Sequence, residues 1–315
     1  MNIQEQIALI DWQREPRGLY EPIAYTMAAG GKRVRPELAM IACQMFNGRE
    51  EDVAPAAMAL EVFHNFTLLH DDVMDKAEVR RGRPTVHIKW NENTAILSGD
   101  QMLIEAYKLL SGVPADKLPQ VLLMFNKMAT EICEGQQYDV DFESQSEVKL
   151  DEYLKMIRLK TAVLLATALK TGAYIAGANA EEQEKIYQFG INIGLAFQIQ
   201  DDILDVWGDP KTFGKAVGGD ISCNKKTFVL LTALQLADKE HREALDSWLV
   251  QTLTDNTEKI SAVKTIYEQL GVRAKCEEAV ETYTSHALEL LHQLPQNTAT
   301  QQLLMLANKL NTRKS

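Results

Sequence analysis

The sequence carries one short acidic motif twice, and both copies follow apolar runs with helical spacing. Residues 71–75 and 201–205 each read Asp-Asp-x-x-Asp. On a helix, residues four apart lie on nearly the same face, and like charges at that spacing destabilise the helix unless a cation offsets them. One copy alone would be equally compatible with a solvated acidic helix end. Two copies behind apolar runs favour two helices that each bind a cation.

Helical periodicity extends through nearly the whole chain, and no run of alternating apolar and polar residues indicates a strand. We therefore expect an all-α fold. The 46% hydrophobic content, with 9 Pro and 17 Gly in 315 residues, is typical of long helices. No linker divides the chain, so we expect one domain over residues 1–315. The expected helical segments are about 3–27 with a break near 16–18, 36–46, 55–75, 92–110, 118–138, 151–178, 180–206 and several within 226–314.

Basic residues lie close to both acidic motifs. Gly-Gly-Lys-Arg-Val-Arg-Pro occupies residues 30–36, and Arg-Arg-Gly-Arg-Pro-Thr-Val-His occupies residues 80–87. Glycines let the backbone approach a ligand, and arginine forks match phosphate oxygens. Oxygen-only carboxylate ligands suit Mg²⁺, which substrate phosphates usually complete. A metal-bridged diphosphate site is the prediction, and a solvated turn or a self-neutralising cluster of salt bridges is the alternative.

Other features of the chain exclude several classes of protein. A formal charge of −11 disfavours nucleic acid as a partner. The four scattered cysteines contain no Cys-x-x-Cys pair, which favours a reduced cytoplasmic protein without structural zinc. Residues 1–20 lack the features of a signal peptide. The most apolar stretch, 161–178, contains Lys170, so we expect a buried helix there and no membrane span.

Taken in order, these motifs resemble those of trans-isoprenyl diphosphate synthases of the polyprenyl synthetase type. The resemblance extends from Gly30 to about Thr227 and includes Phe-Gln-x-x-Asp-Asp-x-x-Asp at 197–205. Ala216 stands where the family often has Pro, and Asn224 where it usually has Gly. The resemblance implies antiparallel helices around a deep central apolar cavity, with the two acidic motifs facing each other across its mouth. It also implies a homodimer.

The same resemblance assigns roles to single residues. It implies roughly three Mg²⁺ ions per active site, bound by Asp71, Asp75 and Asp201, with Asp72, Asp202 and Asp205 as further ligands or support. An allylic diphosphate would contact Arg80, Lys160, Thr161, Gln198, Lys215 and Lys225. Isopentenyl diphosphate would contact Lys32, Arg35, His64 and Arg81. The implied reaction is 1'-4 condensation of the two substrates with release of diphosphate, and it needs no side-chain base.

The helix before the first motif is expected to set product length. Phe66 lies roughly 7.5 Å along the helix axis from Asp71, where a large side chain could stop a growing tail. Thr67 is small, and Phe63 lies one turn further from the motif. An aromatic residue five positions before a first motif without an insertion is similar to short-chain geranylgeranyl synthases. A C20 product is therefore favoured over the C15 farnesyl product.

Three other functions are alternatives to this interpretation. A class I terpene cyclase ionises the same substrates but usually lacks the second aspartate motif and the basic acceptor site. A metal-dependent phosphohydrolase built on His70 and Asp71 would need further histidine ligands, and none is convincingly placed. A non-catalytic subunit of a heteromeric synthase commonly loses an aspartate motif, whereas this chain keeps all six aspartates.

Overall fold

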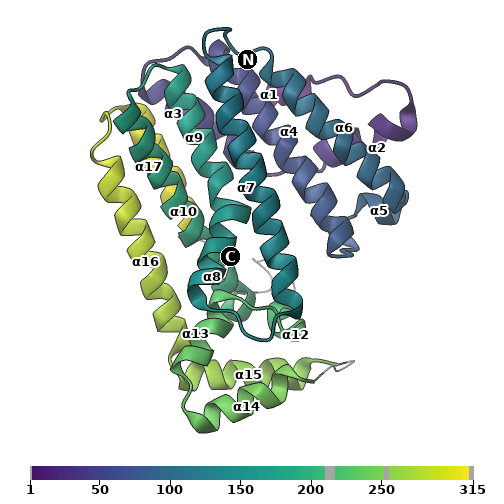
Figure 1. Cartoon of the computed structure of the whole chain (residues 1–315), viewed down its shortest axis with the longest axis vertical. Helices are drawn as coiled ribbons and strands as arrows, with labels where there is room; N and C mark the ends of the chain where they lie inside the picture. Colours follow the sequence, from purple (N-terminus) through teal and green to yellow (C-terminus); the bar gives the residue numbers. More distant parts are fainter. Residues whose placement is uncertain (1, 210–216, 252–254, 312–315) are drawn as a thin grey trace. The chain divides into compact units, whose positions relative to one another are not determined.

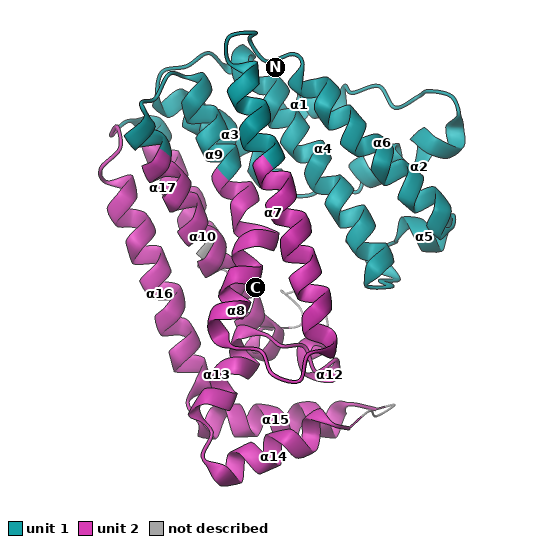
Figure 2. Cartoon of the chain, in the orientation of Figure 1, with its two compact units in different colours: residues 1–126, 167–183, 297–299 teal, residues 127–166, 184–296, 300–315 magenta. Residues whose placement is uncertain are grey.

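The computed structural model describes residues 2–209, 217–251 and 255–311, and the regular secondary structure of these residues is almost entirely helical, which confirms the predicted all-α fold class (Figure 1). The chain divides into two compact units (Figure 2). Unit 1 comprises residues 1–126, 167–183 and 297–299, and unit 2 comprises residues 127–166, 184–296 and 300–315. The expected single domain with a central cavity stays a prediction.

Unit 1 holds the first acidic motif. Its elements are α1 (Ile3–Ala8), α2 (Arg17–Met27), α3 (Val34–Met45), α4 (Glu50–Met74), β1 (Val79–Arg80), β2 (Arg83–Pro84), α5 (Val86–Lys89), α6 (Glu92–Leu110) and the beginning of α7 (Leu118–Ser144). It also holds most of α9 (Val163–Ile175). Strands β1 and β2 pair antiparallel in a two-residue hairpin that sequence periodicity did not predict, because so short a pairing leaves no alternating pattern.

Unit 2 holds the second acidic motif. Its remaining elements are α8 (Leu150–Ile157), the π-helical turn η1 (Arg158–Ala162), most of α10 (Ala180–Trp207), α12 (Gly219–Ser222), α13 (Phe228–Leu236), α14 (Lys239–Leu249), α15 (Thr257–Gln269), α16 (Val272–Leu291) and α17 (Thr298–Asn311). Within this unit α13 packs against α8 and α16, and α15 packs against α12, α14 and α16.

Helix α4 is the core of unit 1 because it packs against both α3 and α6. Its first half buries a row of alanines, so the neighbouring helices approach closely. A Cβ at Gly99 of α6 would lie 2.2 Å from the His70 ring, and one at Gly112, just beyond α6, would lie 3.2 Å from Pro55. Helix α6 therefore runs antiparallel to α4 and presses against the end that carries the acidic motif.

Four predicted boundaries were wrong. Helix α7 ends at Ser144, six residues beyond the predicted end at 138. Helix α4 begins at Glu50, five residues before the predicted start at Pro55, because an acidic first turn suits the positive end of the helix dipole. The break in the first helical segment covers residues 9–16 and is longer than expected. Segment 151–178 is interrupted by η1 at 158–162.

In the part of the chain that the structure describes, none of the helices combines the length and apolarity that a membrane crossing requires.

Candidate active site

The first acidic motif lies at the C-terminal end of α4 in unit 1. Asp71 is half-buried, Asp72 is buried, and Asp75 is the exposed C-cap. Arg80 donates from Nε to Asp72 Oδ1 at 2.7 Å, and its Nη2 lies 3.5 Å from Asp71 Oδ2. Burial raises the pKa of Asp72, and the Arg80 charge opposes that rise. Asp72 therefore serves as a salt-bridge partner here, while Asp71 and Asp75 share the helix face predicted for a cation.

The β1–β2 hairpin brings the two basic motifs together. Its turn residues Arg81 and Gly82 have φ of 53° and 72°, and Thr85 donates to the Ala77 carbonyl at 2.7 Å to close the loop. Arg81 donates from Nη1 to the carbonyl of Gly30. Gly31 lies against the Arg81 guanidinium and has a φ of 138°, which favours glycine where the two segments meet.

Arg33, which belongs to this basic region, forms a buried ion pair with Glu61. Arg33 donates to Glu61 Oε1 at 2.6 Å and to the Met27 carbonyl at 2.6 Å, and Asn65 donates to the same carboxylate oxygen at 2.9 Å. Glu61 is 2% exposed. Sequence reasoning missed Glu61, although a glutamate on the apolar face of a helix, three residues before His64, was a signal that a buried cation lies nearby.

Arg35 adds positive charge to unit 1, and His64 lies close to this and the other arginines. Burial, opposed by Glu61 and reinforced by Arg81, lowers the pKa of Arg35 to about 10. Burial and the nearby arginines hold the pKa of His64 well below its usual value. Among the described residues, no acceptor reaches Arg35 Nε. A bound anion would offset this repulsion, as expected for the predicted set of Lys32, Arg35, His64 and Arg81.

The second acidic motif is held differently, because Asp202 is fully engaged within unit 2. Its Oδ2 accepts a hydrogen bond from Tyr153 Oη at 2.5 Å and from the Phe228 N–H at 3.0 Å. Gln198 donates to Oδ1 at 3.4 Å. Burial raises the pKa of Asp202 to about 7, an effect strengthened by Asp220 and opposed by these hydrogen bonds. Asp202 is thus an anchor for the motif, and Tyr153 is a supporting residue that sequence analysis missed.

Lys160 and Thr161 lie in the π-helical turn η1, which two glycines allow to pack tightly. A Cβ at Gly135 would lie 2.4 Å from the Lys160 backbone nitrogen, and one at Gly194 would lie 2.6 Å from Ala162. Because Asp139 is one turn after Gly135, its carboxylate meets Lys160 Nζ at 2.6 Å. π-Helical turns are frequent at functional sites, so this is where a cation held ready for a ligand is expected.

Four of the predicted residues belong to this region of unit 2. Thr161 Oγ1 lies 3.3 Å from Gln198 Oε1, which links η1 to α10. Asp205 Oδ2 accepts from the Asp220 N–H at 2.9 Å. Lys225 is exposed in the turn between α12 and α13. Lys215 lies outside the described residues.

The residues expected to set product length form an aromatic cluster in unit 1. Phe63 is 1% exposed, and its ring centroid lies 5.5 Å from Phe66 and 5.1 Å from Phe125. Phe66 also meets His70 edge-on at 4.8 Å. Thr67 donates its hydroxyl to the His64 carbonyl at 2.8 Å. Phe66 is half-buried within this cluster, and its role in setting product length stays a prediction.

The aspartates fit Mg²⁺ but not a metal that demands a complete protein cage. Across residues 2–209, 217–251 and 255–311, no three His, Cys, Asp or Glu side chains are grouped to hold a metal ion. Mg²⁺ usually keeps several waters and is bound by one or two carboxylates together with substrate phosphates. Asp71 with Asp75, and Asp201 in the second motif, provide donors of that kind. Asp72 and Asp205, also predicted as ligands, are engaged with Arg80 and with the Asp220 N–H.

Comparison with known proteins gives a consistent result. Residues 16–270 match the family model described as polyprenyl synthetase. The chain is 42% identical to a geranylgeranyl diphosphate synthase of Methanosarcina mazei, over 70% of this chain and 68% of that protein. It is 38% identical to a geranylfarnesyl diphosphate synthase of Natronomonas pharaonis, over 92% and 88%. A crystal structure of a geranylgeranyl pyrophosphate synthase matches with a TM-score of 0.92 and 45% identity, over all of both chains.

The burial of Asp202 predicts a pH-dependent contribution to stability. Its folded pKa of about 7 exceeds the ordinary value of 3.8, so the folded state binds the proton more tightly, and the contribution falls as pH rises from about 4 to 7. Asp202→Asn keeps the hydrogen bonds of Tyr153 and Phe228 but cannot ionise. Its free energy of unfolding relative to wild type, measured in urea with EDTA, should rise by a few kcal/mol across that window. A constant difference would contradict the buried, proton-binding carboxyl.

Proposed function

This chain belongs to the polyprenyl synthetase family of trans-isoprenyl diphosphate synthases, and from that premise we propose that it condenses isopentenyl diphosphate with an allylic diphosphate. The observation that carries the proposal is the buried Nε of Arg35, which has no acceptor in the described part of the chain. Glu61, the carboxylate near Arg35, is already paired with Arg33, so a further anion would offset the positive charge that remains. A diphosphate is such an anion and supplies several acceptors.

The residues of unit 1 would bind and orient isopentenyl diphosphate. Arg35 and Arg81 offer guanidinium donors, with Lys32 exposed beside them. The low pKa of His64 keeps its imidazole neutral, so His64 would contribute a hydrogen bond without adding to the repulsion. Arg33 is neutralised by Glu61 and would hold the segment that carries Lys32 and Arg35.

The allylic diphosphate would be bound by both acidic motifs through Mg²⁺ and by basic side chains. Asp71, Asp75 and Asp201 would hold the metal, which when bound offsets the charge that grows on a leaving diphosphate. Arg80, Lys160, Gln198 and Lys225 would add direct donors, and Lys160 would exchange Asp139 for a phosphate oxygen. Cations placed where charge develops are the main means by which such a site lowers a barrier.

The reaction then needs no side-chain base. The C–O bond of the allylic diphosphate breaks heterolytically, and the double bond of isopentenyl diphosphate attacks the allylic cation to form the new C–C bond. The neighbouring C–H loses its proton to the departing diphosphate, so charge and atoms balance. Arg80, which already bridges Asp71 and Asp72, is suited to holding that diphosphate while it accepts the proton.

A C20 product, geranylgeranyl diphosphate, is our proposal for chain length. It is supported by Phe66 within an aromatic cluster and by relatives that carry the geranylgeranyl name. A relative of similar identity is named as a geranylfarnesyl synthase, so overall identity does not fix product length, and our proposal assigns the limit to Phe66 and its neighbours.

We also propose that the protein is a homodimer and that it works in the cytoplasm. Support for the dimer is an exposed apolar face of α6: Leu97 and Ile104, seven residues apart on one face, are 60% and 54% exposed, and Tyr107 is 40% exposed. Such a face is typical of an interface between copies of a chain, and sedimentation equilibrium would measure the oligomeric state directly. The cytoplasmic location is supported by four free cysteines.

The decisive test of the proposed function is a product assay. Purified protein with Mg²⁺ and isopentenyl diphosphate is given dimethylallyl, geranyl or farnesyl diphosphate, and the dephosphorylated products are sized. We expect elongation to C20, abolished by EDTA and restored by Mg²⁺. A cyclised hydrocarbon would indicate a terpene cyclase, and phosphate release without elongation would indicate a phosphohydrolase. Inactivity with every primer would support a non-catalytic subunit.

Arg35→Ala tests the separation of the two substrate sites. Loss of a buried guanidinium that contacts a phosphate should raise the KM for isopentenyl diphosphate about tenfold or more, while the KM for the allylic substrate stays near that of wild type. Arg83→Ala is the matched control, because Arg83 belongs to the same basic region but stacks 4.0 Å from the Tyr25 ring centroid. Equal increases of both KM values in Arg35→Ala would show that the two sites are one.

Phe66→Ala tests the proposed limit on product length. Removing the ring opens space beside the cavity, so the main product should lengthen by at least one isoprene unit, as measured by chromatography of the dephosphorylated products. Thr67→Ala is the control and should leave length unchanged, because residue 67 is already small. An unchanged product from Phe66→Ala would move the limit to Phe63, or to α6 near Ile104 and Tyr107.

A further inference from the structure

The turn that carries Lys225 is attached at both ends to the second acidic motif. We call residues 218–228 the Lys225 turn. Near its start, the N–H groups of Gly218 and Asp220 donate to the backbone carbonyl and the Oδ2 of Asp205, at 2.6 and 2.9 Å. At its end, the Phe228 N–H donates to Asp202 Oδ2 at 3.0 Å. Lys225 lies between these anchors, so its placement depends on what holds the middle of the turn.

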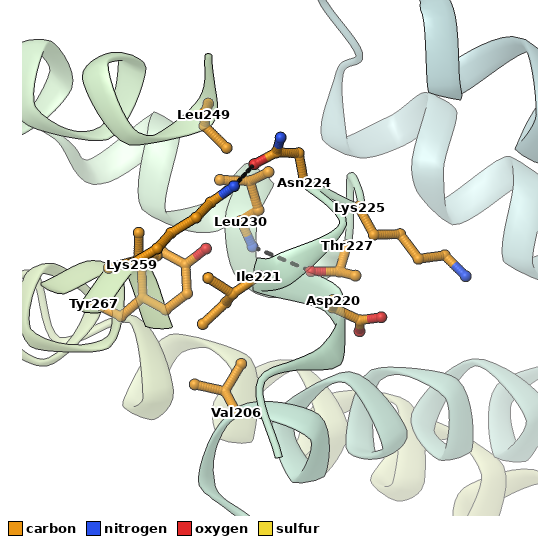
Figure 3. Close-up of a pocket in the computed structure, with 11 residues that line it drawn as sticks. Val206, Asp220, Ile221, Asn224, Lys225, Thr227, Leu230, Leu249, Lys259 and Tyr267 are labelled. Carbon is orange, nitrogen blue, oxygen red and sulfur yellow. Dashed lines mark hydrogen bonds between the residues drawn. The ribbon is translucent and has the colours of Figure 1, made fainter. Parts of the chain in front are cut away.

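Helix α15 provides that contact through two neighbouring residues. Lys259, with 0% exposure, donates from Nζ to Asn224 Oδ1 at 2.6 Å and to the Gln251 carbonyl at 3.2 Å. Figure 3 shows this side chain reaching Asn224 from the side opposite to Lys225, whose own side chain points away from the pocket. Next to it, Ile260 packs against the turn so closely that a Cβ at Gly218 would lie 2.7 Å from its Cγ2.

Burying the Lys259 ammonium costs free energy that an apolar side chain filling the same space would not cost. Burying an ammonium carries a large desolvation penalty, burial lowers the pKa of Lys259, and both of its acceptors are neutral. Apolar neighbours such as Ile221, Leu230 and Tyr267 line the same pocket, so an apolar side chain would fit there. A buried charge is weak evidence for stability, so the contact is better explained by the position that it gives to the turn.

The conformation of Asn224 also indicates that its hydrogen bond with Lys259 positions the turn. Its φ of 54° lies in the left-handed region, which glycine adopts without strain. A glycine would therefore satisfy the backbone but would offer no side-chain acceptor to Lys259. Asparagine is slightly strained in this conformation, but unlike glycine it has a side-chain oxygen that accepts the hydrogen bond from Lys259.

We propose that Lys259 is a positioning residue that, through Asn224, holds Lys225 in place for the allylic diphosphate. This inference rests on the proposed function, because it takes Lys225 as a diphosphate ligand. It places a determinant of allylic substrate binding in α15, outside both acidic motifs and all the basic motifs of the sequence. Lys259 touches no substrate and acts only through the turn.

The test compares Lys259→Met with wild type by three measurements. We expect the KM for the allylic diphosphate and the Kd for inorganic diphosphate with Mg²⁺, measured by calorimetry, each to rise about tenfold, the effect of one misplaced charged donor. The KM for isopentenyl diphosphate should not change. The melting temperature should hold or rise, because an apolar side chain replaces a buried charge. A lower melting temperature with all binding unchanged would mean a structural role alone and would overturn the proposal.

Two further variants make the outcome decisive. Asn224→Gly removes the acceptor, keeps the backbone conformation and should weaken diphosphate binding similarly, and adding Lys259→Met should then change little. If Lys259→Met does not fold, unchanged diphosphate binding in Asn224→Gly refutes the proposal. Lys264→Met, on the same helix and half-buried, is the control and should match wild type. Absence of prenyl transfer by wild type would refute the proposed function, while the calorimetry still tests Lys259.

Discussion

Charge held away from water is the constraint on which both acidic motifs and their surroundings depend. A protein that binds highly charged ligands must keep charged groups ready for them, and each buried charge costs free energy until it has a partner. This chain gives such groups internal partners: Asp72 with Arg80, Arg33 with Glu61, Lys160 with Asp139, and Asp202 with Tyr153. The helices around them are arranged so that these pairs can form.

The sequence was sufficient for the fold class and for the identity of the motifs. Helical spacing predicted an all-α fold, and Asp-Asp-x-x-Asp at helical spacing identified the ends of α4 and α10 as sites for charge. These features are local, because they depend on residues within one or two turns of each other. The comparisons then confirmed the family that the ordered motifs had indicated.

The supporting partners could not be predicted from sequence because they come from distant segments. Tyr153 reaches Asp202 across 49 residues, and Lys259 reaches Asn224 across 35. Neither Tyr153 nor Lys259 stands beside a motif, and each has the pattern of an ordinary amphipathic helix residue. For Asp72 the sequence predicted a different role. Its spacing made it a candidate metal ligand, but in the structure it forms a salt bridge with Arg80. Glu61 could have been found, because a glutamate on an apolar helix face requires a cation.

The π-helical turn at Arg158–Ala162 has a consequence for how the chain tolerates changes in length. A π turn holds one residue more than an α turn, so η1 is equivalent to a single-residue insertion retained between α8 and α9. Deleting one residue there would restore a continuous α-helix and rotate α8 by about 100° relative to α9. Tyr153 would then leave Asp202 while Lys160 and Thr161 lost their own partners. The spacing between residues 153 and 160 is therefore as much a part of the site as the residues themselves, and a deletion there would act like a substitution of several side chains at once.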